Sequence, residues 1–180
     1  MDLFIYMLES IKINQKGLIM KIFSKLLLIG MLSFATLNAY NPLDGVKAQK
    51  QAALKIVGNN FINAKTLKKW IQEDKEFEIV DVREPNEFAA GHIDFIETIH
   101  VPRGVLYAAV KNGALKPNKT YVLVCRTGHR ALLAAATLKK WYKFKKVYVL
   151  KGGIKAWIQN GGVIENSLHL GPVKIKLLEK

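Results

Sequence analysis

Short apolar runs alternate with amphipathic segments over most of the 180-residue chain. The runs at 78–82, 121–124 and 146–150 are rich in Val, Ile and Leu, and they have the length of buried parallel strands. A two-residue strand is expected at 61–62 and an irregular strand at 92–101. Helices are predicted at 46–57, at 64–73, from Pro85 to Gly91, at 105–110, at 131–142 and at 154–159. This alternation predicts an α/β fold with a central, mostly parallel sheet and helices on both faces.

Polar and conformationally special residues mark the ends of several elements. Asn63 is placed to cap the helix 64–73, Pro85 suits the first turn of the next helix, and Gly91 suits its end. The stretch 42–45, Pro-Leu-Asp-Gly, predicts a turn before the helix 46–57. Gly152 and Gly153 break the chain after the strand 146–150.

The N-terminal region resembles a targeting segment. Residues 20–37 have a basic start and an apolar centre, and small residues follow at the candidate cleavage points Ala35 and Ala39. The apolar run is shorter than the roughly 20 residues of a membrane span. We therefore expect a signal peptide starting at Met20, with residues before it as an upstream extension, and an uncleaved anchor is the alternative. Both place the domain in the periplasm or otherwise outside the cytoplasm.

The expected domain organisation follows from these patterns. It comprises the upstream extension and signal peptide (1–39), an N-terminal extension (40–57), one α/β domain (58–162) and a C-terminal tail (163–180). For the tail, the sequence leaves open an added strand, packing on the sheet, and disorder. Contact with a membrane is expected only if the signal segment stays uncleaved.

The net charge of +14 comes mostly from lysine. Scattered lysines are typical of solvated helix faces, and the arginine and aromatic pattern of a base-reading surface is missing, so no nucleic-acid partner is expected. The positive field favours small anionic substrates. With one cysteine, the chain can form neither an internal disulfide nor a cysteine-based metal cluster, and we expect no metal and no cofactor.

That lone cysteine, Cys125, ends the apolar run 121–124 and precedes a compact loop and an alanine-rich helix. Loop amides, the positive end of the helix, Arg126 and Arg130 would stabilise a thiolate or a bound anion there. Gly128 permits the backbone conformation that turns several amides toward one point. Cys125 is therefore a candidate nucleophile rather than a small buried hydrophobe.

The spacing from Cys125 to Arg130 separates two chemistries. Four residues intervene here, whereas cysteine phosphatases need one more to wrap a phosphate, and the position after Arg130 is Ala131. The tighter ring suits a single sulfur atom better than a tetrahedral oxyanion. Phosphatase or arsenate reductase activity remains a weaker alternative.

Three motifs together resemble the rhodanese-like, single-domain sulfurtransferases. They are the loop Cys125-Arg126-Thr127-Gly128-His129-Arg130, the stretch 80–88 with Gly91-His92-Ile93, and the stretch 150–157. They occur in family order over roughly residues 58–162. The chain departs from the family at 94–98, where it has Asp-Phe-Ile-Glu-Thr in place of a shorter Pro-Gly-Ala, so the resemblance leaves open the shape of the neighbouring loop and of the substrate entrance.

The resemblance implies sulfur transfer through a persulfide on Cys125. The thiolate would attack the sulfane sulfur of a small anionic donor such as thiosulfate, and a thiol or cyanide acceptor would then remove that sulfur. The amides of residues 126–130 would hold the outer sulfur, and Arg126, His129 and Arg130 would attract the anion. The substrate-binding candidates are Arg126, Thr127, Gly128, His129, Arg130 and Arg83. A sulfane-sulfur carrier or sensor with little turnover is the alternative.

Several other polar and aromatic residues have simpler interpretations. Asp81 and Arg83 would organise the strand end through charge-assisted hydrogen bonds, although Arg83 could also line the pocket. His92, at a helix end, would satisfy backbone groups. The three tryptophans, Trp70, Trp141 and Trp157, are expected to pack in the core or between helices.

Overall fold

The computed structural model describes residues 17–29 and 41–166. The chain divides into two compact units, residues 1–45 and 46–180, which are described separately. In the first unit residues 17–29 form a helix whose large apolar side chains are exposed. Within the described ranges, no helix combines the length and the apolar character that a membrane span requires. The candidate cleavage points Ala35 and Ala39 lie outside the described residues.

Helix α2 (Pro42–Val57) begins earlier than the sequence pattern predicts. The predicted turn at 42–45 is wrong, because these four residues form the first turn of α2. The Leu43 amide donates to Asn41 Oδ1 at 3.0 Å, and Asp44 lies where the helix dipole favours an acid. Proline is well tolerated at a first helical position, so Pro-Leu-Asp-Gly starts the helix here.

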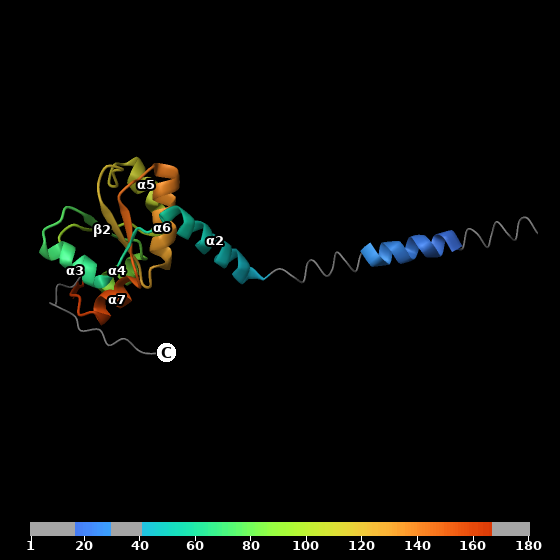
Figure 1. The fold of residues 1–180 in the computed structure, drawn as a ribbon, viewed down its shortest axis with the longest axis horizontal. Helices are drawn as coiled ribbons and strands as arrows, with labels where there is room; N and C mark the ends of the chain where they lie inside the picture. Colours follow the sequence, from blue (N-terminus) through green and yellow to red (C-terminus); the bar gives the residue numbers. More distant parts are fainter. Residues whose placement is uncertain (1–16, 30–40, 167–180) are drawn as a thin grey trace, which may run out of the picture. The chain divides into compact units, whose positions relative to one another are not determined.

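The central sheet has five parallel strands in the order β1-β6-β5-β2-β4. Their bounds are Phe61–Ile62 for β1, Val147–Leu150 for β6, Tyr121–Val124 for β5, Glu78–Asp81 for β2 and Thr98–His100 for β4. The connecting helices are α3 (Ala64–Gln72), α4 (Pro85–Ala90), α5 (Leu106–Lys111), α6 (His129–Tyr142) and α7 (Gly153–Gln159), with a 3₁₀ turn, η1, at Arg103–Val105. The predicted α/β class and parallel sheet are confirmed (Figure 1).

Two apolar clusters cover the two faces of this sheet. One contains buried side chains of α2, α5 and α6, and the other contains side chains of α3 and α7. Ala53 and Val57 of α2 are buried in the first cluster. Strand β5 contributes to both, because alternate residues of a strand point to opposite faces. The middle strand is therefore enclosed on both of its faces.

The prediction of one irregular strand at 92–101 is wrong, because this segment is not a single strand. It forms two strands in different sheets: β3 (His92–Ile93) pairs antiparallel with β7 (Ile164–Glu165), and β4 joins the central sheet. The residues between them form a turn, closed by the Thr98 amide on the Phe95 carbonyl at 2.9 Å. The start of the C-terminal tail thus adds a strand, one of the outcomes that the sequence left open.

Two of the three tryptophans pack as predicted, and one does not. Trp157 is 3% exposed, and Trp70 makes edge contacts with Phe77 and Tyr148 at centroid distances of 5.7 and 5.1 Å. Trp141 is 67% exposed, so its predicted packing role is wrong. The chain turns at the end of α6, and Phe144 fills the core beside Tyr121 at that point.

Candidate active site

Cys125 lies at the carboxyl end of β5, the middle strand of the sheet, and just before α6. Its side chain is 1% exposed, and Sγ accepts hydrogen bonds from the Gly128 amide at 3.1 Å and the Ala131 amide at 3.4 Å. Because α6 begins at His129, its positive end is directed at the same sulfur. Amide donors and a helix dipole stabilise a thiolate more than a thiol, so the geometry fits an activated nucleophile.

The loop folds in this way because of glycines on two segments. Gly128 has a φ of +96°, in the left-handed region that favours glycine. Gly153, at the start of α7, has a φ of +60°, and a Cβ there would lie 2.1 Å from the Cys125 carbonyl oxygen. The amides of Ile154 and Lys155 donate to the carbonyls of Cys125 and Arg126 at 2.8 and 3.2 Å. The start of α7 therefore supports the loop from behind.

The sequence pattern does not predict this supporting role. From sequence, Gly152-Gly153 is interpreted as a chain break, although two consecutive glycines before a helix were the available signal. Only the pairing of β5 with β6 brings that turn against the cysteine loop.

The candidate binding residues of the loop occupy two environments. Arg126 and Thr127 are exposed, whereas Gly128, His129 and Arg130 are half-buried. Arg130 does not stand alone: Nη1 and Nη2 donate to the two carboxylate oxygens of Glu87 at 2.5 and 2.7 Å. Since this ion pair nearly cancels its two charges, Arg126 is the loop arginine best placed to attract an anion.

Glu87 is a site residue that the sequence pattern does not single out. It belongs to α4, where it also completes a capping box with Glu84. The hydrogen bond from Arg130 is the main cause that lowers the pKa of Glu87 from about 4.5 to about 2, against an opposing effect of burial. The same bond raises the pKa of Arg130. The pair ties α4 to the first turn of α6.

We expect Glu87→Gln to remove a pH-dependent contribution to stability. A carboxylate whose pKa is lowered on folding stabilises the native state above its unfolded pKa, and this is lost as the pH falls. The stability difference between wild type and variant should be about 1 kcal/mol, given the partial exposure of both side chains. It should shrink as the pH falls from about 4.5 to about 2. Thermal unfolding over this range tests it.

Glu73, which forms an exposed ion pair with Lys69, provides a matched control. Glu73→Gln should change stability by less than about 0.5 kcal/mol. If the difference between wild type and Glu87→Gln is the same at both ends of the pH range, the Arg130 pair does not hold Glu87 ionised in the folded protein.

Arg83 organises the strand end, the first of its two predicted roles. It is 6% exposed, and Nε and Nη2 donate to the Asp81 carboxylate at 2.9 and 2.6 Å. Its remaining contacts are with backbone carbonyls, from Nη1 to Glu87 at 2.9 Å and from Nη2 to Gly91 at 2.7 Å. These contacts favour the organising role over a substrate contact, and they fix the segment that carries Glu87.

His92 behaves as predicted. Its Nδ1 lies 3.3 Å from the Phe88 carbonyl at the end of α4. Phe88 also stacks on both His92 and His100, at centroid distances of 4.0 and 4.3 Å. These contacts hold the end of α4 close to the carboxyl edge of the sheet. Among the described residues, no group of three or more His, Cys, Asp or Glu is arranged to hold a metal ion.

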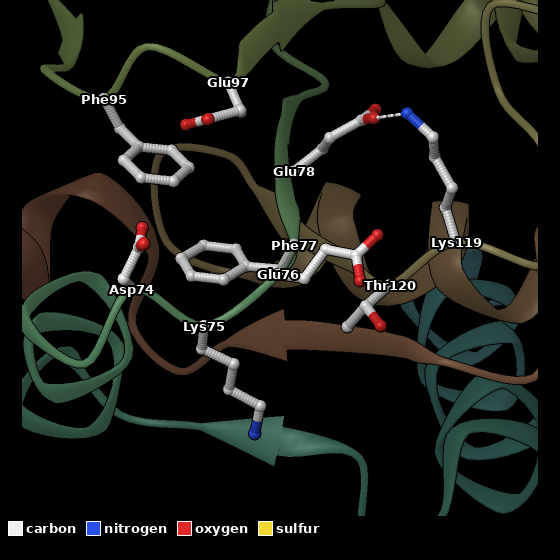
Figure 2. A pocket seen from close by; sticks show the side chains of 9 residues that line it. All are labelled: Asp74, Lys75, Glu76, Phe77, Glu78, Phe95, Glu97, Lys119 and Thr120. Carbon is white, nitrogen blue, oxygen red and sulfur yellow. Dashed lines mark hydrogen bonds and ion pairs between the residues drawn. The ribbon is translucent and has the colours of Figure 1, made fainter.

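The unusual loop at 94–98 lies away from the cysteine. It precedes β4 and, with Phe77, Glu78 and Thr120, lines a cavity of about 360 Å³ through Phe95 and Glu97 (Figure 2). Glu78 begins β2 and Thr120 precedes β5, so this is the amino edge of the sheet. Parallel strands place Cys125 at the opposite edge, so this departure from the family lies at the edge of the sheet away from the cysteine.

Comparison with known proteins identifies the same domain. Residues 63–160 match the family model of the Rhodanese-like domain. The chain is 35% identical over 96 residues to "Putative sulfurtransferase YtwF" of Bacillus subtilis, which covers 53% of this chain and 87% of that protein. It is 31% identical over 118 residues to "Probable adenylyltransferase/sulfurtransferase MoeZ" of Mycobacterium tuberculosis. That match covers 66% of this chain but only 29% of MoeZ.

A solved structure agrees with these relatives. The polysulfide-sulfur transferase homodimer of Wolinella succinogenes is 33% identical, with a TM-score of 0.57, over 71% of this chain and 91% of that one. The parallel sheet, the cysteine loop at its carboxyl edge and the family model all lead to one assignment. This chain belongs to the rhodanese-like domain family.

Proposed function

We propose that this chain is an exported sulfurtransferase that works through a persulfide on Cys125. The observation that carries the proposal is the pair of amide donors on the Cys125 sulfur at the start of α6. The family assignment and the relatives named as sulfurtransferases support it. The substrates would be a small anionic donor, such as thiosulfate, and a thiol or cyanide acceptor.

The reaction divides into two sulfur transfers. The Cys125 thiolate attacks the outer sulfur of thiosulfate, a new S–S bond forms, and sulfite leaves with the electron pair of the broken S–S bond. The acceptor thiolate or cyanide then attacks the outer sulfur of the persulfide, and the Cys125 thiolate is released. No external oxidant or reductant is needed. Loop amides stabilise negative charge on the bound sulfur in both steps.

The test is steady-state kinetics with thiosulfate and cyanide, combined with intact-mass analysis. We expect parallel double-reciprocal plots, typical of ping-pong kinetics, and a mass gain of one sulfur atom after thiosulfate alone. Polysulfide is a second anionic donor, suggested by the Wolinella relative. A mass gain with negligible turnover would instead support the carrier or sensor alternative.

Export is part of this proposal and rests on the sequence at 20–39. Expression of the full chain in an exporting host and intact-mass analysis of the product would test it. Cleavage after Ala35 or Ala39 would support a signal peptide, and a full-length membrane-bound product would support an uncleaved anchor. A full-length chain retained in the cytoplasm would contradict both.

The phosphatase alternative has a separate test. The four-residue spacing between Cys125 and Arg130 argues against it. Hydrolysis of an aryl phosphate that is lost in Cys125→Ser would be needed to support it.

A further inference from the structure

A groove between α2 and α6 lies on the outer side of the first apolar cluster. Its volume is about 210 Å³. It is lined by Gln49, Ala52, Ala53 and Ile56 of α2, by Arg103 of η1, and by Leu133, Ala136, Thr137, Lys140 and Trp141 of α6. The Lys140 ammonium lies 4.8 Å from the centroid of the Trp141 ring, and that tryptophan is 67% exposed. The groove thus combines an apolar floor, an exposed indole and two exposed cations.

The charge on these helices is almost entirely positive. Helix α6 has no acidic residue, and α2 has one, Asp44, in its first turn. The two helices carry five lysines: Lys47, Lys50, Lys55, Lys139 and Lys140. Arg130 is not counted, because it lies in the cysteine loop and is paired with Glu87. The acidic residues concentrate between Glu73 and Glu97, and four of them line the cavity at the amino edge of the sheet (Figure 2). Positive charge is not confined to this face, since α3 also carries Lys65, Lys68 and Lys69 and no acidic residue. What distinguishes the α2–α6 face is the exposed Trp141 indole beside its cations.

The positive charge of α2 and α6 restricts what can bind in the groove. A second copy docked symmetrically would bring lysines against lysines, which is unfavourable. A membrane rich in anionic lipid satisfies both features of the face, because its phosphates attract Lys and Arg and its interfacial region is the preferred environment of tryptophan.

We propose that the α2–α6 face binds the surface of a membrane that contains anionic phospholipid. The Trp141 indole enters the headgroup region, and Lys140 and Arg103 face lipid phosphates. This role is separate from sulfur transfer and does not depend on it.

Tryptophan emission of the full chain with lipid vesicles tests the proposal. The chain has three tryptophans, and Trp157 is buried and Trp70 half-buried, so Trp141 should dominate any change. The apolar helix at 17–29 contains no tryptophan, so its own binding cannot produce the signal. Vesicles of phosphatidylcholine with phosphatidylglycerol should shift the emission to shorter wavelength and allow quenching by brominated lipid. Vesicles of phosphatidylcholine alone should not.

Three variants make the test specific. Trp141→Phe should abolish the shift without altering the melting temperature, because the side chain is exposed. Lys140→Glu should raise the lipid concentration that gives half of the emission shift by at least roughly tenfold. Lys65→Glu, an equal charge change on α3 at the other face, should raise that concentration by less than about threefold.

Either of two results would overturn the proposal. One is an emission of Trp141 that does not change with anionic vesicles, even if the chain sediments with them. That result would favour an acidic protein, rather than a membrane, as the partner of this face. The other is an equal weakening of vesicle binding by Lys140→Glu and Lys65→Glu. That result would show that the net charge of the chain, and not the α2–α6 face, causes the binding.

Discussion

Replacement of Cys125 by alanine should reduce sulfur transfer to the rate measured without protein. The chain has no second cysteine, so no other thiol can carry the sulfur. The same variant should show no mass gain after thiosulfate, whereas wild type should gain one sulfur atom. The Cys125 side chain is small and buried, and its loss should cost only about 1 kcal/mol of stability, measured by urea unfolding.

Cys125→Ser is the sharper companion to this variant. A serine oxygen retains a hydrogen-bond acceptor for the amides of Gly128 and Ala131, so the loop geometry should persist. A hydroxyl is far less ionised than a thiol at neutral pH, and a persulfide cannot form on it. Persistence of both the mass gain and the turnover in either variant would remove Cys125 from the mechanism.

Replacement of Gly153 by alanine should disrupt both stability and activity. The added Cβ would meet the Cys125 carbonyl oxygen at 2.1 Å and the Arg126 carbonyl carbon at 2.7 Å, and both are backbone atoms of the cysteine loop. We expect a loss of about 3 kcal/mol or more in the free energy of unfolding, since the clash adds to the cost of a positive φ. The folded fraction should transfer sulfur roughly 100-fold more slowly, because the loop that holds Cys125 must move.

Gly113→Ala separates the clash from the backbone conformation. Gly113 has a φ of +79°, and no atom lies within 4 Å of the position that a Cβ would take, so only the conformational cost applies. Urea unfolding should show a loss of about 1 to 2 kcal/mol, with normal transfer rates. Equal effects of the two substitutions would mean that the contact between α7 and the cysteine loop does not support the site.

The position of Cys125 could be predicted from sequence because it depends on local features. An apolar run, one cysteine, a glycine-bearing loop and an alanine-rich helix are consecutive, and their order alone places the sulfur at a strand end and a helix start. The Asn63 cap was equally local, and its side chain accepts from the Thr66 amide at 2.8 Å as expected. Such features involve neighbours in the chain.

The surroundings of Cys125 could not be predicted in this way. Arg130 looked like an anion-binding residue, yet it pairs with Glu87, which is 43 positions away. That pairing requires β2 and β5 to be neighbours, so that α4 and α6 both start at the same edge of the sheet. The sequence of the cysteine loop alone does not indicate which acidic side chain will pair with Arg130.

The α/β class, the strands β2, β5 and β6 with the helices that follow them, and the candidate nucleophile were thus determined by the sequence, through hydrophobic periodicity and turn chemistry. Only the tertiary structure decided that Gly153 supports the cysteine loop, that Glu87 forms an ion pair with Arg130 and that Trp141 is exposed. It also decided that β3 pairs with β7 across the chain. Apart from the exposure of Trp141, these features depend on contacts between distant segments, which form only when the strands pair as β1-β6-β5-β2-β4 and β3 pairs with β7.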